Sequence, residues 1–187
     1  LVDRAMRKED TSTQGKIVIE ILQHLNACKN SVAVFYGRNE ELDHLKDYIT
    51  SENNKPFVFY GTGGSGKTAV LSKTAVKSVD EWLKPAVPLL VIRYLGTTPD
   101  SSSLGPLLTS MCQQLSYTYM LSFDDIPDDI VPLTAHFKGI LTKATAKQPL
   151  LVYLDSLDQL VGAQDSNKMS WLPTNLPPHC KIVVSVT

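Results

Sequence analysis

The sequence predicts an α/β fold in which helices flank a parallel β-sheet in three layers. Short apolar runs typical of buried strands recur along the chain, and segments with helical periodicity separate them. Strands that alternate with helices form parallel sheets through right-handed crossovers. One glycine-rich segment directly follows an apolar run and precedes a helical pattern, as at the ligand-binding turn of such sheets. With 187 residues and 43% hydrophobic content, the chain is expected to build one core.

The N-terminal part of the pattern predicts two helices. Apolar residues recur at helical spacing over 17–28 and again over 42–49. A short apolar stretch at 31–36 separates the two helices. Asn39 is the expected N-cap of the second helix, because a short polar side chain can accept a hydrogen bond from the free N–H groups of the first turn.

Strands and helices then alternate to the end of the chain. Apolar runs predict four strands, at 56–60, 89–95, 150–154 and 181–186. Helical periodicity predicts three helices among them, at 66–79, 104–115 and 133–144. Pro106 is compatible only with the first turn of its helix, because proline has no N–H to donate. The acidic stretch 123–132 and the proline-containing stretch before the last strand are expected to be irregular connections.

The glycine-rich segment predicts a nucleotide site. Residues 61–68 read G-T-G-G-S-G-K-T and fit the Walker A pattern G-x-x-x-x-G-K-[ST]. Glycines allow backbone N–H groups to approach phosphate oxygens, and the next helix adds its positive end. We expect Lys67 to reach the β- and γ-phosphates of ATP or ADP, and the Thr68 hydroxyl to ligate Mg²⁺. The expected nucleotide contacts are Gly61, Thr62, Gly63, Gly64, Ser65, Gly66, Lys67, Thr68 and Ala69.

An acidic residue follows the third expected strand. The run 150–154 is continuously apolar, which is typical of a strand buried on both faces of a parallel sheet, and it leads into Asp155. A carboxylate at the C-terminal end of such a strand faces the ligand crevice. Asp155 is therefore expected to orient the Mg²⁺ shell as the Walker B residue. The alternative is an aspartate that caps a turn.

Composition argues against several classes of partner. The net charge is −1 and the basic residues are scattered, so no nucleic-acid partner is expected. No apolar segment approaches the length of a membrane span, and no signal peptide is recognisable, so we expect a cytoplasmic protein with no membrane partner. The cysteines are few and far apart, which favours packed, reduced thiols. The histidines are too dispersed for a metal site and are expected to be structural or surface residues: His24, His44, His136 and His179.

The motifs together resemble the NACHT group of signal-transduction (STAND-type) P-loop ATPases. The resemblance covers roughly residues 30–187. It rests first on Gly37-Arg38 ahead of the loop, on the loop itself, and on L-V-Y-L-D-S-L-D at 151–158. Three further stretches are similar to NACHT and WD-repeat proteins: R-Y-L-G-T-T-P-D-S-S at 93–102, L-L-T-S-M-C-Q-Q-L at 107–115 and W-L-P-T-N-L-P at 171–177.

The resemblance implies a three-layer P-loop NTPase fold that is incomplete at its C-terminal side. Residues 1–30 would form an N-terminal helical lead-in and 31–187 a NACHT-like nucleotide-binding domain, as a piece of a longer protein. The last strand would lie between the phosphate-loop strand and the Asp155 strand, and would bring Ser185 or Thr187 toward the γ-phosphate. Arg38 would lie near the base and ribose, together with Val34 or Phe35. The alternative for Arg38 is a surface ion pair.

Hydrolysis is expected to be slow or absent. Ser156 stands where many related ATPases have a glutamate that polarises the attacking water. The resemblance moves this acidic role to Asp158, for which an N-cap or ion pair is the alternative. Lys67, Asp155 and Asp158 are thus the candidate catalytic residues. The family's pattern often has an arginine just after the Thr-Ser of the last strand, where this chain shows Ser-Val-Thr, and loss of an arginine donor costs on the order of 10³ to 10⁵ in rate.

The resemblance implies a nucleotide-controlled signalling or assembly switch. Protein partners would bind through WD or other repeats outside this chain, and self-assembly would depend on the nucleotide. The alternative is a phosphotransferase of the P-loop nucleoside-kinase type, which would need an arginine-rich lid. The chain has no arginine between Gly96 and Leu150, which favours the switch. A helicase-type ATPase would need a basic face or aromatic stacking platforms, and neither is evident.

Overall fold

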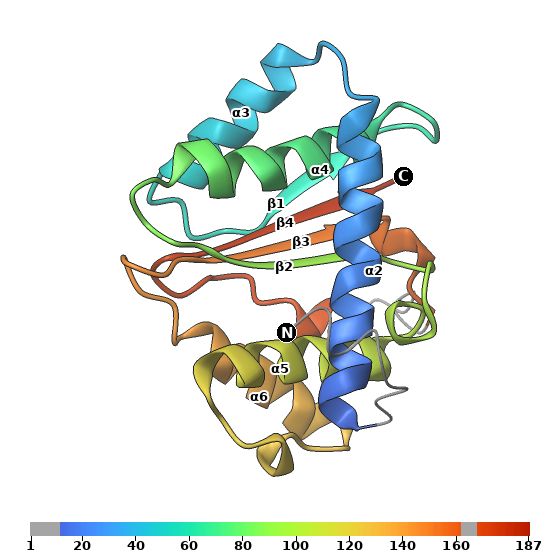
Figure 1. Cartoon of the computed structure of the whole chain (residues 1–187), viewed down its shortest axis with the longest axis vertical. Coiled ribbons are helices and arrows are strands. Elements are labelled where there is room, and N and C mark those ends of the chain that lie inside the picture. The colour runs from blue at the N-terminus through green and yellow to red at the C-terminus, as the bar shows by residue number, and fades with distance from the viewer. Residues whose placement is uncertain (1–11, 162–167) are drawn as a thin grey trace.

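The computed structural model, which describes residues 12–161 and 168–187, confirms the α/β fold. Its sheet has four parallel strands in the order β1-β4-β3-β2 (Figure 1). The last strand of the chain therefore pairs with both the phosphate-loop strand and the Asp155 strand, as the resemblance implied. The strands are β1 (Phe57–Tyr60), β2 (Leu89–Tyr94), β3 (Leu150–Asp155) and β4 (Cys180–Val186).

Helices cover both faces of the sheet. Figure 1 shows α3 and α4 on one face and α5 and α6 on the other. Their apolar sides enclose two cores, one against each face of the sheet. Helix α4 continues into a π-helical turn, η1 (Ser78–Trp82). The flanking helices are α3 (Asn39–Thr50), α4 (Lys67–Lys77), α5 (Leu104–Tyr119) and α6 (Ile130–Leu141).

Strand β3 is buried along its whole length, as its continuous apolar run predicts. Leu151 and Tyr153 point into the core beneath α4, whereas Leu150, Val152 and Leu154 point into the core beneath α5 and α6. The strand ends at Asp155, opposite Tyr94 of β2. The sheet thus carries this carboxylate to the edge where its strands end.

Helix α2 (Thr13–Ala33) runs across the β2 edge of the sheet and spans both helical layers (Figure 1). It contacts α4, α5 and β2. Its N-cap is Ser12, whose side chain accepts a hydrogen bond from the N–H of Gly15 at 3.1 Å. The helix is longer than the predicted segment 17–28, because it continues through the first residues of the apolar stretch 31–36.

Two other predicted boundaries differ from the structure. Arg38, with a φ of 61°, is the N-cap of α3, and Asn39 is the first helical residue. Gly37 is also left-handed, with a φ of 72°, so the chain turns sharply before the helix begins. Helix α6 begins at Ile130, which places Pro132 in its first turn, where no donor is lost. Ala144 lies beyond the end of this helix.

Short 3₁₀ turns occupy several connections: η2 (Pro99–Ser101), η3 (Phe123–Asp125), η4 (Leu157–Gln159) and η5 (Lys168–Trp171). Cys28, Cys112 and Cys180 are buried free thiols, as predicted. None of the described helices is long and apolar enough to cross a membrane.

Candidate functional site

The glycine-rich loop connects β1 to α4 and contains two left-handed glycines. Gly64 has a φ of 75° and Gly66 a φ of 85°. Gly66 is the N-cap of α4 and makes no side-chain cap, so the first N–H groups of the helix face the loop. Glycine is needed at both positions, because other residues adopt this conformation only with strain. The loop therefore has the backbone of an anion-binding turn.

The ammonium group of Lys67 lies within this loop. Its Nζ donates to the carbonyl oxygens of Gly61 at 2.5 Å and Thr62 at 3.0 Å. Only 7% of the residue is exposed, because the first turn of α4 and the loop enclose its alkyl chain. A cation is thus held against the carbonyl oxygens at the start of the loop.

Thr68 and Asp155 meet across the sheet edge. The Thr68 hydroxyl donates to Oδ2 of Asp155 at 2.7 Å, although the residues are far apart in the sequence. Ser185 of β4 donates to the other carboxylate oxygen, Oδ1, at 2.6 Å, and accepts a hydrogen bond from the N–H of Ser156 at 2.8 Å. Asp155 is buried. Helix α4, β3 and β4 each contribute one side chain to this cluster.

The donor set of this cluster fits a hard divalent cation. Mg²⁺ prefers hydroxyl, carboxylate and phosphate oxygens and keeps several waters, so it is seldom held by a complete protein cage. Thr68 and Asp155 provide two such oxygens beside a loop with anion-binding geometry. Among the described residues there is no cluster of three or more histidine, cysteine or acidic side chains that could hold a metal ion. If Mg²⁺ binds here, Thr68 and Asp155 are the residues that would hold it.

Asp158 lies next to this cluster, on the 3₁₀ turn η4. Its Oδ1 accepts from the N–H of Thr187 at 3.0 Å and its Oδ2 from Nε2 of Gln159 at 2.9 Å. Partial burial works to raise the pKa of Asp158, but these hydrogen bonds and the charge of Lys67 outweigh it, so the pKa is lowered. The pKa of the Asp158 carboxylate is therefore influenced by the charge of Lys67. Thr187 contacts Asp158 through its backbone N–H.

Arg38 forms the surface ion pair considered for it and also contacts the glycine-rich loop. Its Nε forms an ion pair with Glu41 at 2.7 Å, and its Nη1 donates to the carbonyl oxygen of Ser65 at 2.9 Å. The guanidinium therefore lies against the phosphate loop as well as in a surface pair. Of the apolar residues before it, Val34 is 82% exposed, whereas Phe35 packs partly against the core.

The structure thus brings Lys67, Thr68, Asp155 and Ser185 together at one end of the sheet, with Asp158 and Arg38 beside them. A second group of buried polar side chains lies behind this site and was not predicted. It includes Ser72 and Tyr94, whose hydroxyl oxygens are 2.6 Å apart, and the buried His24. The only signal for Ser72 in the sequence is its spacing of four from Thr68, which places both hydroxyls on one side of a helix.

Comparisons with curated proteins give relatives whose names contain WD repeats or tetratricopeptide repeats. The chain is 34% identical over 184 residues to NACHT and WD repeat domain-containing protein 2 of Mus musculus, which covers 94% of this chain and 10% of that protein. It is 29% identical over 189 residues to NACHT domain- and WD repeat-containing protein 1 of Homo sapiens, covering 96% of this chain and 12% of that protein. A WD repeat-containing protein of Nostoc sp. is 28% identical over 173 residues, covering 88% of this chain and 13% of that protein. No family model matches the chain.

The chain therefore spans 10% to 13% of the length of these relatives. The match to them extends over nearly all of its own residues, including the loop and the Asp155 strand. The fold agrees with this relationship, since it is that of a partial P-loop NTPase. The chain is homologous to the NACHT and WD-repeat-containing proteins, the family that its motifs resemble.

Proposed function

We propose that this chain is an ATP- and ADP-binding module that acts as a nucleotide-controlled switch within a larger signalling protein. One observation carries the binding proposal: the Thr68 hydroxyl and the Asp155 carboxylate meet at 2.7 Å beside the glycine loop that holds Lys67. Phosphate recognition requires backbone donors, a cation and a metal-binding oxygen pair in one place. These parts come from separate elements, so their convergence supports a built site.

Each residue has a distinct part in the proposed binding. The N–H groups of the loop and of the first turn of α4 would face the phosphates, and Lys67 would exchange its carbonyl partners for phosphate oxygens. Bound Mg²⁺ would neutralise phosphate charge, with Thr68 and Asp155 as its protein oxygens. Ser185 would keep the Asp155 carboxylate in place, since it is hydrogen-bonded to it at 2.6 Å.

Hydrolysis by this chain is proposed to be slow or absent. Asp158 is the available acidic residue, and its lowered pKa keeps it ionised at neutral pH. Its two oxygens already accept hydrogen bonds from Thr187 and Gln159, which leaves it poorly placed to take a proton from water. No arginine side chain other than Arg38 contacts the loop in the described part of the chain. Nucleotide retention rather than turnover suits a switch.

The test is an equilibrium titration of the chain with fluorescent ATP and ADP, with and without Mg²⁺, while phosphate release is monitored. Lys67→Ala should weaken binding by at least about tenfold, because a charge-assisted hydrogen bond contributes about 1.5–3 kcal/mol. Lys77→Ala is the matched control: it removes a lysine from the same helix, where the side chain pairs with Glu81 instead. Equal affinity for wild type and Lys67→Ala would refute the site.

A further inference from the structure

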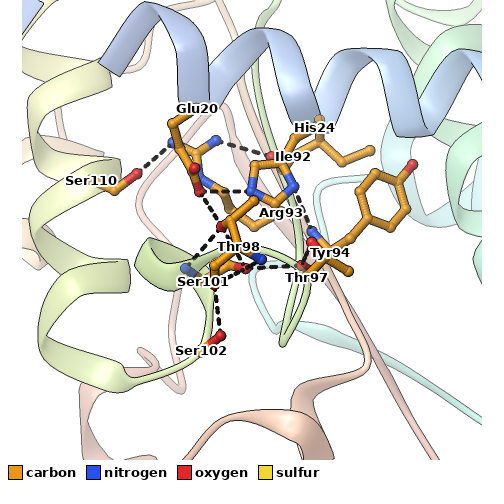
Figure 2. Close-up of polar contacts among 10 residues, drawn as sticks. All are labelled: Glu20, His24, Ile92, Arg93, Tyr94, Thr97, Thr98, Ser101, Ser102 and Ser110. Carbon is orange, nitrogen blue, oxygen red and sulfur yellow. Dashed lines mark hydrogen bonds and ion pairs between the residues drawn. The ribbon is translucent and has the colours of Figure 1, made fainter. Parts of the chain in front are cut away.

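Helix α2 covers the open edge of the sheet with polar side chains. Strand β2 pairs with β3 on one side only, so alternate backbone groups face outward and need other partners. Figure 2 shows how they are satisfied: the N–H of Tyr94 donates to Nδ1 of His24 at 3.1 Å, and the carbonyl of Ile92 accepts from Nη1 of Arg93 at 2.9 Å. The edge is closed by side chains instead of by another strand.

The histidine in this contact has a defined proton position. Because Nδ1 of His24 accepts the Tyr94 N–H, the ring proton lies on Nε2, which donates to Oε1 of Glu20 at 2.8 Å. The same carboxylate oxygen accepts from the Thr98 hydroxyl at 2.7 Å. The His24 ring also stacks on the Tyr94 ring, with centroids 6.0 Å apart. Directional contacts therefore hold α2 at the end of β2.

The same tyrosine contacts the phosphate-loop helix. Ser72 has one hydroxyl proton, which it donates to the carbonyl oxygen of Thr68 at 2.6 Å. The Tyr94 hydroxyl must then donate to Oγ of Ser72, 2.6 Å away. In addition, Sγ of Cys28 on α2 lies 3.7 Å from the carbonyl oxygen of Ser72. A continuous set of buried contacts thus runs from α2 to the turn that carries Thr68.

We propose that Tyr94 and Ser72 are positioning residues that couple the seating of α2 to Mg²⁺–nucleotide binding. Ser72 holds the carbonyl of Thr68, whose hydroxyl meets Asp155, so the first turn of α4 is held from both sides. Any shift of Thr68 toward a bound cation is then transmitted through Tyr94 to His24. Nucleotide binding then changes the equilibrium between packed and displaced α2 by some factor. By thermodynamic linkage, displacement of α2 changes the nucleotide affinity by the same factor. The inference rests on the proposed nucleotide binding.

The chain contains a matched control for this coupling. Tyr153 of β3 contacts Oγ of Ser78 at 2.8 Å, and Ser78 donates to the carbonyl of Thr74 at 2.7 Å. This tyrosine–serine pair repeats the geometry of Tyr94 and Ser72 at the far end of the same helix. It has no link to Thr68, so Tyr153→Phe should disturb packing and hydrogen bonding as Tyr94→Phe does, without touching the site.

The experiment measures hydrogen exchange of peptides from α2 and the affinity for ADP with and without Mg²⁺. In the wild type and in Tyr153→Phe, Mg²⁺–ADP is expected to slow exchange in α2. In Tyr94→Phe this protection should shrink, and the gain in affinity from Mg²⁺ should fall by about two- to tenfold, the effect of one neutral hydrogen bond. Tyr94→Phe leaves no buried donor unsatisfied, because Ser72 keeps its bond to Thr68.

Other outcomes would overturn the inference. If the wild type binds Mg²⁺–ADP but α2 exchanges at an unchanged rate, α2 is not coupled to the site. This measurement needs no variant, so it decides the matter even if Tyr94→Phe folds poorly. Equal effects of Tyr94→Phe and Tyr153→Phe would reduce Tyr94 to a packing role. A wild type that binds no nucleotide would instead refute the proposed function, and with it this inference.

Discussion

The side chains of the candidate site have separable chemical roles. Lys67 is a cation hydrogen-bonded to carbonyl oxygens, whereas the Asp155 carboxylate accepts hydrogen bonds from the hydroxyls of Thr68 and Ser185. Asp155 is also buried, and buried charges in proteins are normally paired or coordinate a metal. This chemistry separates the expected effects of changing Lys67 from those of changing Asp155.

Asp155→Asn is expected to act through the metal. The substitution keeps the size of the side chain but removes the charge of a proposed Mg²⁺ ligand, so nucleotide binding in Mg²⁺ should weaken by about 10- to 100-fold, because interactions of charged groups contribute about 1.5–3 kcal/mol. Binding without Mg²⁺ should change little. Titration of ADP in Mg²⁺ and in EDTA measures both values. Asp125→Asn, in the connection before α6, is the control, and equal losses in both buffers would make Asp155 structural.

The sequence predicted the loop residues and Asp155 because their identity carries the signal: glycines for left-handed turns, and a carboxylate directly after an apolar run. His24 was assigned only a structural or surface role, and Ser72 and Tyr94 were not identified at all. Each of these is an ordinary residue in its own helix or strand. Their contacts depend on how α2, β2 and α4 pack, and no local pattern encodes that arrangement.

The elements themselves follow from periodicity where the apolar pattern is strong. Strand β3 and helices α4 and α5 lie close to their predicted positions. Their positions were predictable because a buried strand has a continuous apolar run, whereas an amphipathic helix has apolar residues every three or four positions. Boundaries were less predictable. Residues 31–33 continue α2. Arg38 caps α3 because the chain turns at Gly37 and Arg38, and this backbone conformation cannot be predicted from the side chain of Asn39.

The buried network under α2 should make its attachment sensitive to acid. Burial works to raise the pKa of Glu20, but hydrogen bonds from His24 and Thr98 outweigh it and lower the pKa below the ordinary value of 4.5. A lowered pKa in the folded state means that the contribution of Glu20 to stability is complete above about pH 4.5 and is lost as pH falls through the lowered value. The nearby Arg93 adds to this dependence, since it would lose its anionic neighbour.

Glu20→Gln should therefore make the free energy of unfolding depend less on pH at acidic pH. The free energy of unfolding of the variant should be lower than that of the wild type at neutral pH, and the two should converge as pH falls below about 4. Denaturant titrations between pH 3 and 7 measure the difference. Glu52→Gln changes an exposed carboxylate and should run parallel to the wild type. A constant difference for Glu20→Gln at every pH would contradict the assignment.

For the molecule as a whole, the arrangement of the strands decides where the site forms. Inserting β4 between β1 and β3 places Ser185 next to Asp155 and brings the end of β3 within reach of α4. Helix α2 packs against α4, α5 and β2, and so connects the two helical layers across the open edge of the sheet (Figure 1). This helix therefore contacts α4 in one layer and α5 in the other.

If the chain is a switch, nucleotide should alter the assembly of the larger protein that carries it. We expect the mass of that protein, measured by light scattering over a range of concentrations, to differ between ATP and ADP. Lys67→Ala should abolish the difference, and Lys77→Ala should preserve it. The same mass in ATP, in ADP and without nucleotide would remove assembly from the proposed function while leaving nucleotide binding intact.

Residue identity and spacing were enough to predict the α/β class, the glycine-rich turn after the first strand and the acidic strand end, and the resemblance of the motifs predicted the relationship to NACHT and WD-repeat proteins. These features are local, because a turn needs particular glycines and a buried strand needs a continuous apolar run. The contact of Thr68 with Asp155, the side-chain closure of the β2 edge and the link from His24 to Ser72 arise only on folding. They join segments distant in the chain, and packing of α2 and α4 against the sheet selects which polar groups meet.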